Sequence, residues 1–488
     1  MTGTLAAILA LLLPWLLGIM ALLGICNFVS PRQTGQPGPI PIAAPVLLGY
    51  GYILGVYLAS LVLRLWSLAG LRFDFSAILL MIGVMSLLAA YWTRHNLSTI
   101  QFSRQEGKVL GWQRLLFWAL LGLLAIRFGG FFLELWWRPL LAWDAWWTYA
   151  AHARIWYESG SMVPIIPDSL WFANQEFAGY AYFPDRFSTI PLLQTWMALA
   201  WGSWDDSVIN LPWLGCGIAL CLAFYGQVRI SGVTALMSLL LTYLLISIPL
   251  LGMHIALPGY MDLWVATTYA MAGMAFFLWV ADSQPGQLAL FVVSLIACIL
   301  AKAPAFAWAL TFVPGLLVYF WGRKALILVI ASISVIFLGL MLGSTRILIE
   351  LPFIGQLAID SFSHSGEQAG DALASDLGQV SEEILNNLLL MGNWNLYGFV
   401  LLLLVPALPL LIWVRPISSE SVVLLTGVAF ILFTFWFTNK GIWAVDYTLF
   451  NRVVLHIVPL SLFYLVWIGQ RSRLFGYFRA IPSAGPKQ

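Results

Sequence analysis

The chain has 488 residues, of which 61% are hydrophobic and 9% are charged, and its mean hydropathy is +0.90. So few polar side chains cannot cover the surface of a water-soluble globule, which excludes that class. Lysine and arginine total 23 against 21 aspartates and glutamates, and no stretch carries the basic cluster that nucleic-acid binding requires. The composition indicates an integral membrane protein without a nucleic-acid partner.

Apolar runs recur along the whole chain, and each is long enough to cross a hydrocarbon layer of about 30 Å. We therefore expect an all-α fold, a polytopic transmembrane helical bundle with about thirteen spans. The predicted spans cover residues 5–27, 43–67, 76–93, 114–135, 208–227, 232–253, 262–281, 286–301, 304–321, 324–343, 396–414, 421–438 and 451–469.

Gly51 and Gly55 stand one helical turn apart in the second predicted span. Small residues at this spacing let two helix backbones approach closely in a membrane. We predict a tight helix contact here and assign these glycines to packing rather than to chemistry.

One further apolar run, from Ile190 to Ala200, is too short to cross and suits an interfacial or re-entrant helix. If it does not cross, the loops richest in Lys and Arg fall on one face, which the positive-inside rule predicts to be cytoplasmic. Two long hydrophilic loops, 138–207 and 344–395, then lie on the opposite face. We expect a multi-pass protein of the inner membrane whose functional site faces the periplasm.

The first long loop opens with an acid among indoles, in the sequence Trp143-Asp144-Ala145-Trp146-Trp147-Thr148-Tyr149-Ala150-Ala151-His152-Ala153-Arg154. No Gly or Pro interrupts it, so we predict an interfacial helix with Asp144, Thr148 and His152 on one stripe. An aromatic belt at headgroup level is an equally good explanation of the tryptophans. A carboxylate in so apolar a setting is costly to desolvate, and it typically marks a pathway, a metal or a catalytic base.

Further charged residues lie on the same predicted face. Asp185, beside Arg186, is either a site residue or part of a solvated turn. Asp262 begins a span, where it is either a helix cap or a second site carboxylate that shares a proton or a divalent cation with Asp144. Lys302 and Arg452 lie at span ends, where a buried cation needs an anion, either Asp262 or Asp446 or a substrate phosphate.

The order of these residues resembles a known family. The resemblance rests on five short motifs, which are Trp143-Asp144-Ala145-Trp146, Pro184-Asp185 before Pro191-Leu192-Leu193, Tyr260-Met261-Asp262, Lys302-Ala303-Pro304, and Arg452 with His456 before Pro459. In this order they are similar to bacterial relatives of the dolichyl-phosphate-mannose protein mannosyltransferases, which are membrane glycosyltransferases of the GT-C fold. The resemblance covers residues 114–469, and it implies an N-terminal transmembrane extension over 1–113 and a cytoplasmic tail over 470–488.

The resemblance implies a sugar donor on a polyprenyl phosphate and a lipid- or glycan-borne acceptor at the periplasmic face, in the synthesis of cell-envelope glycans. Asp144 would be the catalytic carboxylate that deprotonates the acceptor, with Asp262 as a second polar group near the reacting centre. Lys302 and Arg452 would hold the leaving phosphate. Contacts to the substrates are assigned to a further set, which comprises Arg154, Asp185, Tyr260 and His456.

Two other classes stay open at this point. A transporter or lipid flippase would also be polytopic with charges in its spans, although the chain shows no internal repeat. An O-antigen-type ligase or polymerase would use the same donors with arginines in place of an acidic helix. No P-loop or dinucleotide fingerprint is present, so no nucleotide cofactor is expected, and the need for a divalent metal is left open.

Overall fold

The structure is a computed structural model. It describes residues 3–29, 42–95, 100–101, 110–138, 140–166, 171–172, 179–180, 189–342, 346–351, 355–360, 370–400, 418–438 and 440–471. Helices dominate these residues, which confirms the all-α membrane architecture. The chain divides into two compact units, the first with Met1–Ser247, Leu251–Lys302 and Leu462–Gln488 and the second with Ile248–Leu250 and Ala303–Ser461.

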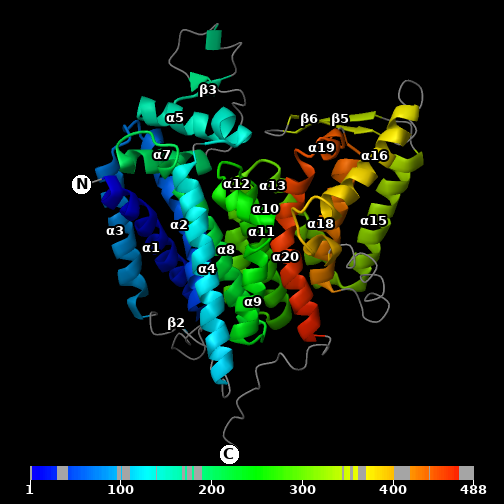
Figure 1. Cartoon of the computed structure of the whole chain (residues 1–488), viewed down its shortest axis with the longest axis horizontal. Coiled ribbons are helices and arrows are strands. Elements are labelled where there is room, and N and C mark those ends of the chain that lie inside the picture. The colour runs from blue at the N-terminus through cyan, green and yellow to red at the C-terminus, as the bar shows by residue number, and fades with distance from the viewer. Residues whose placement is uncertain are drawn as a thin grey trace, which may run out of the picture. The chain divides into compact units, whose positions relative to one another are not determined.

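The first unit is a bundle of long helices (Figure 1). Its helices are α1 (Gly3–Val29), α2 (Ala44–Leu68), α3 (Phe75–Thr93), α4 (Gly111–Trp137), η2 (Ala145–Tyr149), α5 (Ala150–Ser159), α7 (Thr189–Trp201), η3 (Val208–Asn210), α8 (Leu211–Ile230), α9 (Ala235–Ile246), α11 (Asp262–Asp282) and α12 (Pro285–Ala301). The helix α10 (Pro249–Ala256) begins in the second unit and ends in the first. Two short parallel pairs join β1 (Ile42–Ala43) to β2 (Ile100–Gln101) and β3 (Ile165–Ile166) to β4 (Gly179–Tyr180).

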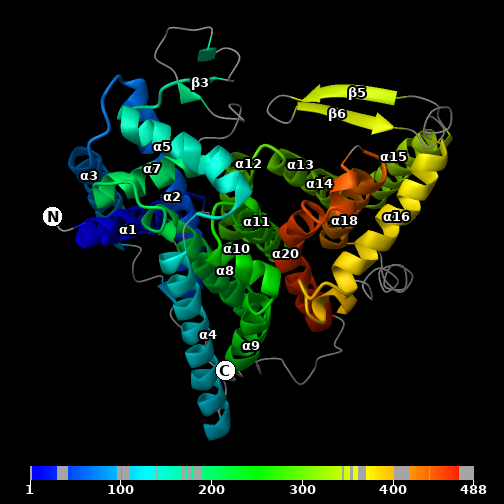
Figure 2. The ribbon, with the colours of Figure 1, turned by 45° about the horizontal axis from the view of Figure 1, so that its top comes forward.

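The helix α11 forms the centre of this unit. Every residue from Asp262 to Leu278 is buried, on all faces of the helix, and α8 and α12 pack against it. A helix that is covered all round has no lipid-facing stripe, so its sequence shows no amphipathic pattern. By contrast, α4 leaves most of its apolar side chains exposed and lies at the outside of the unit beside α9 in both ribbon views (Figures 1 and 2).

The predicted close contact at Gly51 and Gly55 is confirmed between α1 and α2. A Cβ atom on Gly55 would come within 1.9 Å of the Pro14 carbonyl oxygen, and one on Gly18 would come equally close to the carbonyl oxygen of Gly51. Since any larger side chain would force the helices apart, the missing Cβ atoms set their separation.

Hydropathy located the helices well. Among the described residues, eight helices are long and apolar enough to cross a membrane, or nine if α9 and α10 form one span bent by 71°. The predicted spans 286–301 and 304–321 correspond to α12 and to α13 (Ala305–Leu310) with α14 (Phe312–Trp321), which are apolar but short. The predicted span 396–414 lies mostly outside the described residues. The total of about thirteen spans stays a prediction.

The run predicted not to cross is the buried helix α7, whose 13 residues extend about 20 Å, too short for a span. Its Thr195 hydroxyl donates to the Ala153 carbonyl of α5, and its Trp196 indole donates to the Ala10 carbonyl of α1. These bonds hold α7 against α5 and α1, and α7 lies beside α5 at one end of the bundle (Figures 1 and 2).

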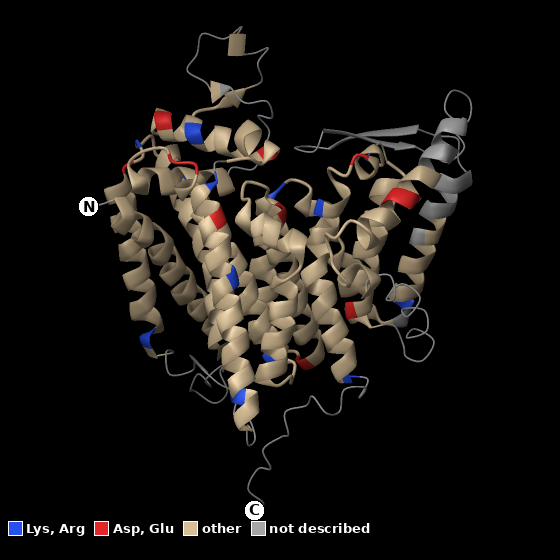
Figure 3. Ribbon diagram, in the orientation of Figure 1, with Lys and Arg blue, Asp and Glu red and all other residues tan. Residues whose placement is uncertain are grey.

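The charges of the first unit lie mainly toward its two ends, with mostly uncharged ribbon between them (Figure 3). Successive long helices run in opposite directions, so the start of α3, the end of α4 and the starts of α8 and α11 share the end where α5 lies. Acids gather there, namely Asp74, Glu134, Asp144, Glu158, Asp205, Asp206 and Asp262, and so do the bases Arg64, Arg72, Arg138, Arg154 and Lys302, whereas Arg94, Arg114, Arg229 and Asp282 lie near the opposite helix ends. The acids of this unit are thus divided unevenly between its ends, and the cytoplasmic basic face stays a prediction.

The second unit contains α13 (Ala305–Leu310), α14 (Phe312–Trp321), α15 (Arg323–Leu342), α16 (Gly370–Leu389), α18 (Ser419–Trp436), α19 (Ile442–Val445) and the larger part of α20 (Phe450–Arg471). The antiparallel hairpin of β5 (Arg346–Leu351) and β6 (Gly355–Asp360), together with α16, forms the described part of the long loop 344–395. The helices α1 to α3 pack in the same unit as α4 to α9, and the boundary at residue 113 stays a prediction.

Candidate functional site

Asp144 precedes a π-helical turn. Residues Ala145–Tyr149 form η2, in which the N–H of Ala150 donates to the Ala145 carbonyl five residues earlier. The predicted helix is therefore present, but its first turn is wider than the α-helix from which the stripe of Asp144, Thr148 and His152 is predicted, and that stripe stays a prediction. Such turns are often found at functional sites.

The side chains of this segment divide between a buried and an exposed face. Thr148, Tyr149 and His152 are buried, and Asp144 is half-buried. The neighbouring indoles of Trp143, Trp146 and Trp147 pack on one another with centroids 5.2 to 5.4 Å apart. Trp143 and Trp146 remain 58% and 45% exposed, as the aromatic-belt explanation also requires.

A glycine joins the Asp144 segment to the connection before α11. Gly259 has a φ of +116°, and a Cβ atom at this position would lie 2.1 Å from the Cβ of Ala145. Only a residue without a side chain fits both the backbone angle and the space. This contact places the turn that leads into Asp262 directly against the residue after Asp144. Sequence reasoning missed Gly259, although Pro258-Gly259 before a span is a recognisable turn signal.

Asp262 and Lys302 form a buried ion pair. The Lys302 Nζ lies 3.0 Å from the Asp262 Oδ1, and the side chains are 11% and 1% exposed. Asp262 is the first residue of α11 and Lys302 comes directly after the last residue of α12, so each charge also meets the favourable end of a helix dipole. Of the alternatives for Lys302, the internal pair with Asp262 is the one observed.

Two buried indoles hold the turn before α11. The Trp213 indole donates to the Tyr260 carbonyl at 3.0 Å, and its ring meets that of Trp264 edge to face at 5.8 Å. The Tyr260 ring packs against the imidazole of His254, with centroids 5.7 Å apart. The hydrogen bond to its carbonyl and the contact of its ring thus hold Tyr260, a predicted substrate residue, two positions before Asp262 of the ion pair.

The described residues contain no group of three or more His, Cys, Asp or Glu side chains that could hold a metal. At Asp262, the Lys302 ammonium already pairs with one of the two carboxylate oxygens. A cation at this carboxylate would have to displace that ammonium or share the carboxylate with it.

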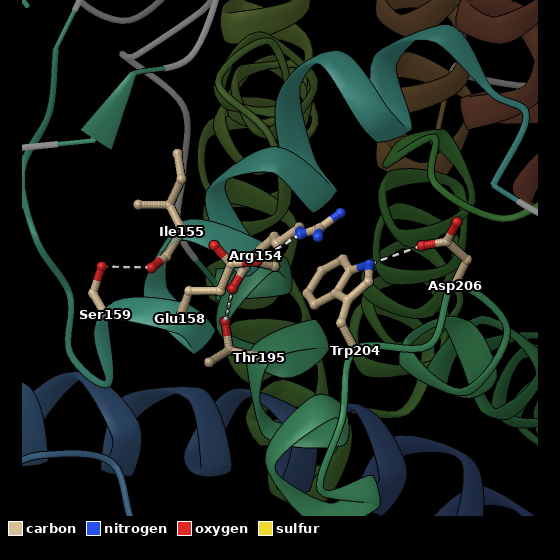
Figure 4. A network of polar contacts seen from close by, with 8 residues as sticks. Arg154, Ile155, Glu158, Ser159, Thr195, Trp204 and Asp206 are labelled. Atoms are coloured by element: carbon tan, nitrogen blue, oxygen red, sulfur yellow. Dashed lines mark hydrogen bonds and ion pairs between the residues drawn. The ribbon is translucent and has the colours of Figure 1, made fainter.

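Arg154 lies in a surface network (Figure 4). Its Nε lies 2.8 Å from the Glu158 Oε1, both side chains are 59% exposed, and the guanidinium stands 5.8 Å from the ring centroid of Trp204. The Trp204 indole in turn donates to Asp206. This arrangement is typical of a solvated ion pair, which contributes little to stability. Asp185 lies outside the described residues.

Arg452 and His456 lie in the first two turns of α20, in the second unit. Arg452 is half-buried, whereas His456 is buried with its ring edge-on to that of Trp308, at 5.4 Å. The preceding Asn451 accepts a hydrogen bond from the Trp394 indole at 3.0 Å and donates one to Asn387 of α16. That Arg452 shares a cavity with Asp144 stays a prediction.

Comparison with family models, with curated proteins and with solved structures finds no match for this chain. The candidate site therefore stands on the chain's own geometry.

The buried ion pair predicts a large asymmetry between single and double variants. Lys302→Met leaves the Asp262 carboxylate buried without its ammonium, so the free energy of unfolding should fall by about 3–5 kcal/mol. The double variant Asp262→Leu with Lys302→Met should recover most of that loss, because no buried charge remains. Denaturant unfolding in mixed micelles measures both, and a loss from Lys302→Met no larger than that from the surface variant Arg154→Gln would contradict the assignment.

The contact at Gly259 predicts a cost beyond backbone strain. Gly259→Ala and Gly232→Ala both place a side chain at positive φ, but only the first meets a neighbour, because the space around Gly232 is open. We expect Gly259→Ala to lower the free energy of unfolding by about 1–3 kcal/mol more than the matched control. The same unfolding measurement tests this, and equal losses would show that Ala145 can move aside freely.

Proposed function

We propose that this chain is a membrane glycosyltransferase of the GT-C type. It would move a sugar from a polyprenyl-phosphate donor to a lipid- or glycan-borne acceptor at the periplasmic face. The observation that carries the proposal is the contact of Gly259 with Ala145, which brings the Asp144 segment against the turn that enters the Asp262–Lys302 pair. An acid near a second, ion-paired acid at one end of a helical bundle supplies groups for proton transfer and for phosphate binding.

The reaction assigns a separate role to each group. The Asp144 carboxylate would take the proton of the acceptor hydroxyl as that oxygen forms its bond to the anomeric carbon of the sugar. The bond from this carbon to the phosphate oxygen breaks, and the polyprenyl phosphate leaves with the electron pair. Lys302 and Arg452 would stabilise the charge that develops on the phosphate. Because Lys302 already faces Asp262, it would bridge the phosphate and this carboxylate.

The position of the acids supports a reaction at the membrane surface. Most acids of the first unit lie at the helix ends near α5, together with basic residues such as Arg154 and Lys302, while Arg94, Arg114 and Arg229 lie near the opposite ends. By the positive-inside rule the acidic end would face the periplasm. A lipid donor could reach such a site from within the bilayer, and an acceptor could reach it from water.

One observation favours a second candidate, a transporter or lipid flippase. The helix pair α9 and α10 is broken at residues 247–248 and bent by 71°. Discontinuous helices are typical of transporters, in which the freed backbone groups bind substrate or coupling ions. The two candidates differ in the fate of the donor lipid, because a transferase removes its sugar and a flippase moves it across the membrane unchanged.

Asp144→Asn should lower sugar transfer by about a hundred- to ten-thousandfold, because the acceptor hydroxyl loses its base. The assay compares a deletion strain carrying the wild-type gene, the Asp144→Asn gene or no gene. Mass spectrometry of polyprenyl-phosphate sugars and envelope glycans measures the outcome. In the strains with the Asp144→Asn gene or no gene, the donor should accumulate and the envelope glycan should lack one sugar.

The matched control is Glu158→Gln, an exposed acid on α5 that pairs with Arg154. It should behave as wild type. A full complement of envelope glycan with Asp144→Asn would remove the catalytic assignment. If purified wild-type protein moves donor lipid across a vesicle membrane but never consumes it, the flippase replaces the transferase.

Arg452→Gln should raise the KM for the donor by about tenfold or more and leave the KM for the acceptor unchanged, because only the donor carries a phosphate. The control is Arg471→Gln at the other end of the same helix. Steady-state kinetics with purified protein and the donor identified above measure both constants. An equal rise for both substrates would assign Arg452 to structure instead.

A further inference from the structure

Arg127 lies deep within the predicted fourth span. It stands ten residues before Trp137, the last residue of α4, and thus about 15 Å from that helix end. The side chain is half-buried, and the apolar residues around it on the same helix are largely exposed, among them Leu123, Ile126 and Phe132. A guanidinium at this depth cannot rely on water and needs acceptors from protein or lipid.

The protein satisfies one side of the guanidinium. The Arg127 Nε donates to the Ile246 carbonyl at 2.9 Å, and the group lies 5.1 Å from the ring centroid of Phe131. Ile246 is the last residue of α9, where a carbonyl lacks its helical partner and the helix dipole is negative. Arg127 therefore caps α9 at the break between α9 and α10.

Four N–H donors remain on the two terminal nitrogens of Arg127. Among the described residues, no hydrogen bond or ion pair to either nitrogen occurs. Gly252 of α10 lies close by, since a Cβ atom there would stand 3.2 Å from one of these nitrogens. The hydroxyl of Ser247, the residue after Ile246, is also buried without a hydrogen-bond partner in the described structure. The break thus carries guanidinium donors that no described acceptor satisfies, beside a hydroxyl that can donate or accept.

We propose that Arg127 and the break between α9 and α10 form a binding site for a lipid-borne phosphate. The phosphate oxygens would accept bonds from the terminal guanidinium nitrogens in the forked geometry that arginine offers to such anions. Its hydrocarbon tail would lie along the exposed apolar face of α4. The site does not depend on the proposed sugar transfer, and its residues are other than the Lys302 and Arg452 assigned to the donor phosphate.

The test measures lipid binding to purified full-length protein by native mass spectrometry. The probes are farnesyl phosphate, dioleoylphosphatidylglycerol and inorganic phosphate, which distinguish a prenyl phosphate, a phospholipid headgroup and the free anion as the source. We expect Arg127→Gln to weaken binding of at least one of the two lipids by about ten- to a hundredfold. Inorganic phosphate, which has no tail, should bind neither protein.

The matched control is Arg138→Gln, just beyond the end of the same helix, where the arginine is exposed and paired with Glu134 at 2.5 Å. It should bind both lipids as wild type does. Arg127→Lys keeps the charge without the fork and should recover only part of the affinity. If Arg127→Gln elutes as a monodisperse folded species and binds both lipids unchanged, the site does not exist. If Arg452→Gln lowers lipid binding and Arg127→Gln does not, the Arg127 site is likewise overturned, while the transferase proposal stands.

Discussion

The pairing of charge inside an apolar protein is the constraint on which the rest of the first unit depends. Asp262 opens its most buried helix, and the carboxylate is tolerated there because Lys302 meets it at the end of the next helix. The pair joins the two helix ends, and the turn before Asp262 is held by the Trp213 indole and by the contact with Ala145. Asp144, which precedes the π turn, and Asp262 of the ion pair are therefore parts of one packed end of the bundle.

Hydropathy and charge could predict the helices, because each span must satisfy its backbone internally and each is long relative to a bilayer. The shortness of α7 and the packing role of Gly51 and Gly55 could be predicted from the same physics. The π turn after Asp144 could not be predicted, since one extra residue in a turn depends on tertiary packing rather than on local preference. The choice of partner for Lys302 also depends on which helix ends meet, and the sequence left that choice open.

Arg127 and the pair at Lys302 show two ways of placing a cation within this protein. Lys302 meets a carboxylate, and the two charges offset each other, whereas the described partners of Arg127 are a carbonyl and the ring of Phe131, neither of which carries a charge. A neutral pair can hold structure without a ligand, but a charged group beside a broken helix attracts an anion from its surroundings. The break between α9 and α10 is relevant to both the transferase and the flippase proposal, because in either case a lipid substrate would have to pass between helices.

The central position of α11 has a consequence for how the chain reaches its final form. It is the least apolar of the eight described helices that could cross a membrane, and it carries Asp262, Thr267 and Thr268 among its buried residues. Left alone in lipid, such a segment would enter the bilayer poorly at its charged end. Its integration during synthesis would benefit from the arrival of α12, whose lysine neutralises that acid. The order in which the helices leave the ribosome thus becomes part of how this site is assembled.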